Sequence, residues 1–151
     1  MIKELKVDAI KCGTVIDHIP PGKVFKVIDL LGIGENDQVM IGTNLSSPKH
    51  GRKDVIKIEN RYLSIEEINS VSLVARSATI SIIEDFKPCK KTKIEIPDVL
   101  KGILVCPNRH CVTNSEPVIT VFDVEAKDPL SIRCRYCERV FGEEIGKANS
   151  L

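Results

Sequence analysis

Two short stretches near the C-terminus, CPNRHC at residues 106–111 and CRYC at residues 134–137, decide how the last third of the chain folds. Each stretch places two cysteines close enough for one tight loop to direct both sulfurs at a single point. Two such loops on antiparallel strands supply four thiolates in the tetrahedral arrangement that zinc accepts. The spacing therefore predicts one structural zinc ion per chain, bound by Cys106, Cys111, Cys134 and Cys137.

Three other interpretations of these cysteines are weaker. Disulfides would suit an exported protein, but the start of the chain, MIKELKVDAI, has no apolar run behind a basic stretch. A redox-active pair at Cys134 and Cys137 normally lies where a strand meets a helix, and it would leave the other pair without a role. His110 could replace a neighbouring ligand, although an exposed loop position is the simpler interpretation. Four thiolates leave no open coordination position, so the metal should be structural and not catalytic.

Short β-prone stretches surround the cysteine pairs, at residues 102–105, 118–124, 130–133 and 139–142. They predict a small antiparallel β domain in which metal binding supplies much of the folding energy that so short a chain lacks. From residue 99 onward the chain has seven Lys and Arg residues and seven Asp and Glu residues. A neutral module of this kind favours contact with protein over contact with nucleic acid.

The first two thirds of the chain alternate between strand and helix patterns. We expect strands at residues 7–19, 38–45, 54–58 and 79–83, with a turn at 46–51. Val24, Val27, Ile28 and Leu31 line one face of a first helix, which Gly32 ends. A second helix, from about residue 65 to 75, begins at the capping box of Ser64 and Glu67. The order strand, helix, strand, strand, helix, strand predicts an α+β, ferredoxin-like domain.

A boundary between the two domains is expected near KPCKKTK, residues 87–93. Four lysines and one proline in seven residues are typical of a solvated linker. We therefore predict a ligand-binding domain at residues 1–96 and a zinc-binding domain at residues 97–151.

Composition excludes several classes of function. The 151 residues are 42% hydrophobic and 28% charged, as in a globular protein, and their net charge of +1 gives no general attraction to nucleic acid or to an anionic membrane. No apolar segment approaches the length needed to cross a bilayer. We expect a cytoplasmic protein.

A ligand site in the first domain is suggested only weakly by the residues themselves. No glycine-rich phosphate loop is present, so phosphates would have to bind lysine side chains on or beside the strands, among Lys11, Lys53, Lys57 and Lys91. Asp17 and His18 add one carboxylate and one imidazole, which suit a ribose hydroxyl and a phosphate. The alternative is that all of these residues serve solubility. An enzyme is less well supported, because the three histidines are scattered and no nucleophile has a recognisable setting.

The chain resembles the regulatory chain of aspartate carbamoyltransferase, the enzyme of pyrimidine biosynthesis that is under nucleotide feedback. The resemblance spans nearly the full length and is carried by VDAIKCGTVIDHIP (7–20), GRKDVIKIEN (51–60), VCPNRHC (105–111), Glu116-Pro117 and CRYCERVF (134–141). Two rival classes remain beside it, a zinc-ribbon adaptor that binds nucleic acid and a small enzyme that acts alone.

This resemblance implies a noncatalytic regulatory subunit. Its first domain would bind CTP in competition with ATP and pair with a second regulatory chain, and its zinc domain would dock on the catalytic chain and transmit feedback control. By position, the base would meet the backbone of Val7, Asp8, Ala9, Ile10 and Lys11. The ribose would lie at Asp17 and Lys57, and the phosphates at His18 and Lys91. Val15, Val55 and Thr79 would line the pocket.

Overall fold

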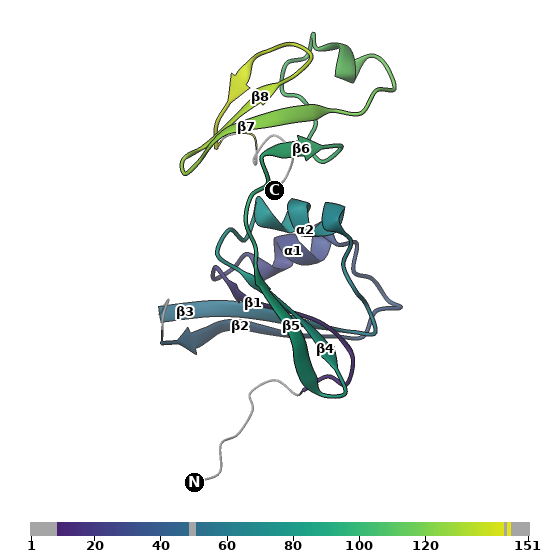
Figure 1. Ribbon diagram of the computed structural model, residues 1–151, viewed down its shortest axis with the longest axis vertical. Coiled ribbons are helices and arrows are strands. Elements are labelled where there is room, and N and C mark those ends of the chain that lie inside the picture. The colour runs from purple at the N-terminus through teal and green to yellow at the C-terminus, as the bar shows by residue number, and fades with distance from the viewer. Residues whose placement is uncertain (1–8, 49–50, 144, 146–151) are drawn as a thin grey trace. The chain divides into compact units, whose positions relative to one another are not determined.

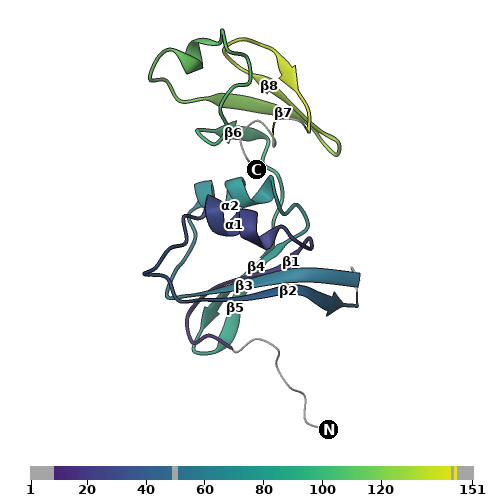
Figure 2. The same cartoon turned by 180° about the vertical axis from the view of Figure 1, so that it is seen from behind.

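The computed structural model describes residues 9–48, 51–143 and 145, and the chain divides into two compact units, residues 1–95 and 96–151. The first unit contains β1 (Gly13–Ile19), α1 (Val24–Leu30), β2 (Val39–Ser47), β3 (Gly51–Glu59), α2 (Ile65–Ser72), β4 (Thr79–Glu84) and β5 (Lys87–Lys93). These strands form one antiparallel sheet in the order β2-β3-β1-β4-β5, and both helices cover the same face of it (Figures 1 and 2). The predicted α+β class and βαββαβ order are confirmed.

The core of the first unit lies between the helices and the sheet. Ile16 of β1 pairs with Ile56 of β3 and with Ile80 of β4, and all three belong to one buried apolar cluster with Val24, Val27 and Val71 from the helices. The capping box at Ser64 and Glu67 is present and begins α2. The side chain of Asp54 is fully buried, and it accepts hydrogen bonds from the backbone N–H groups of Gly22, Val24 and Asn44.

The prediction of a solvated linker at residues 87–93 is wrong. These residues form β5, which pairs antiparallel with β4 at one edge of the sheet. Every side chain of β5 is exposed. The strand forms because the backbone groups of β4 need partners on that side, and lysine and proline suit an edge strand that has no further neighbour.

Smaller differences concern the ends of the predicted elements. The first strand begins only at Gly13, and α2 ends at Ser72 instead of near residue 75. The predicted strand at 102–105 is also wrong, because the structure has β6 at Val99–Lys101, and a bend at Gly102 takes the chain out of the sheet. No helix among the described residues is long and apolar enough to span a membrane.

The second unit is a small antiparallel sheet in the order β6-β7-β8-β9. β7 spans Val121–Lys127, β8 spans Leu130–Cys134 and β9 spans Val140–Phe141, and a short 3-10 helix, η1, spans Val112–Asn114. Leu100, Phe122 and Ile132 are fully buried. This unit therefore has a small apolar core of its own, as the predicted β-rich domain requires.

Candidate metal centre and open sheet face

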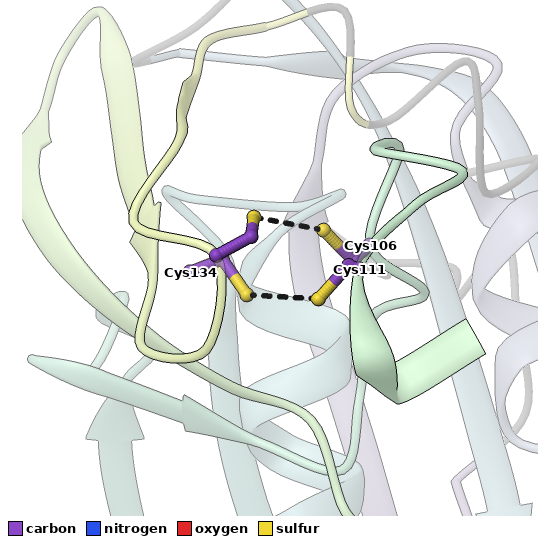
Figure 3. A group of neighbouring side chains, drawn as sticks. Cys106, Cys111 and Cys134 are labelled. Atoms are coloured by element: carbon purple, nitrogen blue, oxygen red, sulfur yellow. Dashed lines mark hydrogen bonds between the residues drawn. The ribbon is translucent and has the colours of Figure 1, made fainter. Parts of the chain in front are cut away.

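The four predicted cysteine ligands come together in the second unit. Cys106 and Cys111 lie in the loop between β6 and η1, Cys134 ends β8, and Cys137 lies in the turn toward β9. All four Sγ atoms lie within 4.8 Å of one another. Two of the contacts, Cys106 to Cys137 and Cys111 to Cys134, are 3.8 Å each (Figure 3). These separations are far longer than a disulfide bond of about 2.05 Å, so the four thiols surround a point where one ion could bind.

Hydrogen bonds hold the first cysteine loop in position. The side-chain amide of Asn114 donates to the backbone carbonyls of Cys106 and Asn108 at 2.9 and 2.8 Å. The hydroxyl of Thr113 donates to the sulfur of Cys111 at 3.2 Å. His110 is exposed and is not part of the cluster. Cys106 and Cys111 are thus held by hydrogen bonds from neighbours in sequence, an arrangement found around metal ligands.

Electrostatics differ among the four thiols. Burial raises the pKa of Cys106 and of Cys134. Burial acts the same way on Cys137, but hydrogen bonds from the backbone of Arg139 and from Asn108 lower its pKa to about 7. Burial also acts on Cys111, but hydrogen bonds from Thr113 lower its pKa. The site therefore favours thiolates at Cys111 and Cys137, and a bound cation would favour thiolates at the other two positions.

The predicted ligand residues of the first unit share the face of the sheet that the helices leave uncovered, which we call the open sheet face. Side chains alternate along a strand, and Ile16, Ile56 and Ile80 point to the helices. Their strand neighbours therefore point to the opposite side. The open sheet face includes Val15, Asp17, Lys53, Val55, Lys57, Thr79, Ser81 and Lys91.

A β-bulge in β1 brings His18 to the open sheet face. The register of β1 against β3 shifts between Ile16 and Ile19, so one extra residue is accommodated there, and His18 has a positive φ of 57°. The Nδ1 atom of His18 lies 3.4 Å from the hydroxyl oxygen of Thr79. The structure thus brings together Asp17, His18, Lys57 and Lys91 around four adjacent strands.

Lys53 also lies on the open sheet face, although the family resemblance assigns it no role. Its ammonium lies 2.8 Å from a carboxylate oxygen of Asp17, which also accepts a 2.6 Å hydrogen bond from the backbone N–H of His18. Partial burial raises the pKa of Asp17, but these hydrogen bonds and the charge of Lys53 lower it more, so it lies below its usual value. The sequence predicts Lys53 as a candidate for binding phosphate, and alternation along β3 puts it on the same face as Val55 and Lys57, but its pairing with Asp17 was not predicted.

The remaining predicted residues lie ahead of β1. Val7 and Asp8 are outside the described residues. Ala9 is exposed, Ile10 is buried, and Lys11 is exposed in a bend where its carbonyl accepts a hydrogen bond from the N–H of Phe86. This contact fixes the segment before β1 beside the turn between β4 and β5.

The structure defines a two-domain protein, with a lysine-bearing sheet face in one unit and a closed four-cysteine cluster in the other. Family models agree with this class. Residues 5–95 match the allosteric domain of the aspartate carbamoyltransferase regulatory chain, and residues 98–147 match the metal binding domain of the same chain. The chain belongs to the aspartate carbamoyltransferase regulatory chain family.

Curated relatives extend over the same length. The regulatory chains of Pyrococcus abyssi and Pyrococcus furiosus are each 52% identical over 149 residues, which cover 97% of this chain and 98% of theirs. The regulatory chain of Thermoplasma acidophilum is 48% identical over 147 residues, covering 95% of this chain and 97% of its own. The predicted family is confirmed, and it is a family of regulatory, noncatalytic chains.

Proposed function

We propose that this chain is the regulatory subunit that assembles with the catalytic chain of aspartate carbamoyltransferase and controls it through CTP, in competition with ATP. The observation that carries the proposal is the open sheet face, which bears one carboxylate, one imidazole and lysines at three positions. A nucleoside triphosphate offers ribose hydroxyls that donate and phosphate oxygens that accept, and this set of side chains complements both.

Each residue has a distinct part in this proposal. Asp17 accepts from a ribose hydroxyl while Lys57 donates to the ribose region, and His18 with Lys91 donates to phosphate oxygens. Val15 and Val55 give the face an apolar floor. Backbone groups at residues 7–11 bind the base. Lys53 keeps Asp17 ionised and oriented, because the two groups are already paired.

We further propose that the four-cysteine centre holds one structural zinc ion. Four sulfurs placed about 2.3 Å from a central zinc lie about 3.8 Å apart, and two of the sulfur–sulfur distances here are 3.8 Å. Four thiolates form a closed site without a position for a reacting group. The zinc unit would dock on the catalytic chain in the cytoplasm, while first units pair to form a regulatory dimer.

The nucleotide site can be tested by calorimetric titration of the full chain with CTP. Lys57→Ala and Lys91→Ala should each weaken CTP binding, because each removes a charged donor worth roughly 1.5–3 kcal/mol. Lys87→Ala is the matched control, since Lys87 is an exposed lysine of the same strand as Lys91 but is absent from the proposed site. If both variants bind CTP as tightly as the control, the proposed site is wrong.

A further inference from the structure

A cavity of about 330 Å³ lies in the first unit, where Ile68 of α2 faces residues of β4 and β5. Its apolar wall consists of Ile68 from α2, Ile80 and Ile82 from β4, and Ile94. All of these residues belong to the first unit, and none belongs to the proposed nucleotide site. The volume falls in the range of about 300–1,000 Å³ that small-molecule sites occupy.

Ile82 of β4 leaves apolar surface beside this space. β4 continues past Ile80 and pairs with β5 as a hairpin. Ile80 and Ile94 belong to the buried core cluster, but Ile82 does not, although it is two residues from Ile80 and shares its side of the sheet. Ile82 therefore presents apolar surface to the cavity without a protein partner that covers it completely.

Two lysines of the lining, Lys90 and Lys93, give the cavity positive charge. Lys90 pairs with Ile82 in the register of β4 and β5, so it lies at the rim of the helix-covered side, whereas the next residue, Lys91, alternates to the open sheet face. Among the described residues, no carboxylate forms an ion pair with Lys90. Glu95 is the only acidic group of the lining.

From this arrangement we propose a second, non-nucleotide site that binds an unbranched aliphatic carboxylate of medium chain length, such as octanoate. The isoleucine wall offers dispersion contacts and no aromatic ring for stacking, so it suits an alkyl chain. The lysine at the rim suits one anionic head group. The site is distinct from the proposed nucleotide site, because its isoleucine wall and Lys90 lie on the other side of β4 and β5 from Lys91.

The test is a titration of the full chain, without nucleotide, with butyrate, hexanoate and octanoate, observed through isoleucine methyl NMR signals. The signals of Ile68, Ile80 and Ile82 should shift, while that of Ile132, buried in the second unit, should stay in place. Affinity should rise by about twofold to fourfold for each added methylene, as burial of the alkyl chain requires. Equal affinities along the series, or no shifts at the three cavity residues, would overturn the proposal.

A charge-reversal variant at the rim distinguishes binding of octanoate in the cavity from a general attraction of octanoate to lysines. Lys90→Glu should weaken octanoate binding at least about threefold to tenfold, because it replaces the head-group donor with a like charge. Lys87→Glu makes the same charge change on an exposed residue of the same strand outside the lining and should leave affinity unchanged. Equal effects of the two variants would mean that octanoate is attracted to the strand as a whole and that the cavity is not its site.

Discussion

At the scale of single residues, the ion pair of Asp17 and Lys53 is the best-defined feature of the open sheet face. The two groups come from β1 and β3 and lie 2.8 Å apart, and each side chain is less than one third exposed, at 31% and 21%. Partial shielding from water makes this pair stronger than a fully exposed pair, and it fixes Asp17 as a hydrogen-bond acceptor. The pair therefore links the stability of the sheet to the chemistry of the proposed site.

This pair should make stability depend on pH. Because folding lowers the pKa of Asp17, its contribution is fully present above the unfolded pKa of about 3.9 and is lost as pH falls through the lower, folded pKa. At pH 7, wild type should exceed Asp17→Asn by about 0.5–1 kcal/mol in free energy of unfolding. Urea unfolding, followed by the methyl signal of Ile16, should show this difference shrinking below about pH 4. A difference that is the same at pH 7 and pH 3 would show that the charge is not involved.

The sequence predicted some of these residues and not others, for physical reasons. Cysteine spacing identified all four members of the metal cluster, because two tight loops constrain the sulfurs before any tertiary structure is known. The pairing of Asp17 with Lys53 depends on the register of two strands and on the bulge between Ile16 and Ile19. Neither can be read from a single sequence, because both are set by how the two strands meet.

At the scale of elements, β5 shows how tertiary context overrides composition. KPCKKTK has the composition of a linker, yet it forms an edge strand with every side chain exposed. Its own preference for a strand is low, so the pairing with β4 stabilises it. This strand places Lys91 on the open sheet face and Lys90 at the cavity, and a linker would have placed neither. Local patterns did predict the two helices and the hairpin of β2 and β3, because caps and turns act over short distances.

Gly13, at the start of β1, should be the position of this sheet that least tolerates an added side chain. Gly13 has a φ of 140°, and a Cβ atom there would lie 2.1 Å from the carbonyl oxygen of Ile58. Gly13→Ala should therefore destabilise the first unit by at least about 2 kcal/mol, measured by urea unfolding. Gly34→Ala is the control, since a Cβ atom there meets nothing within 4 Å, and it should change stability by less than about 1 kcal/mol. Equal stabilities of the two variants would mean that β1 and β3 are not held at the described distance.

At the scale of the whole molecule, the chain joins two units that fold by different means. The first unit has a cluster of isoleucines and valines between two helices and a sheet. The second unit has few large buried side chains, and its four cysteines are gathered where a metal would complete the interior. Because only the second unit depends on a metal for its interior, we predict that loss of the metal unfolds the second unit and not the first.

Removal of one thiolate should unfold the second unit and leave the first unit folded. Cys134→Ser should reduce zinc from about one ion per chain to a small fraction and unfold the second unit, because metal binding energy is folding energy in such a module. Metal analysis gives the first result, and the methyl signals of Ile132 and Ile16 report the two units separately. Cys89→Ser, which changes an exposed cysteine of β5, should keep the zinc and both signals. Full zinc content in Cys134→Ser would exclude the proposed centre.

The central claim is that nucleotide on the first unit controls a catalytic chain, and reciprocal coupling tests it most directly. Coupling between two ligand sites is a free energy of typically about 1–3 kcal/mol, and it must appear with equal size from either side. The measurement is a calorimetric titration of CTP into the complex with catalytic chains, with and without a tight bisubstrate analogue. We predict that the analogue changes CTP affinity by about 5–150-fold, and that CTP changes analogue affinity by the same factor. Equal CTP affinities in the two titrations would contradict the account, because the chain would then bind nucleotide and partner without coupling them.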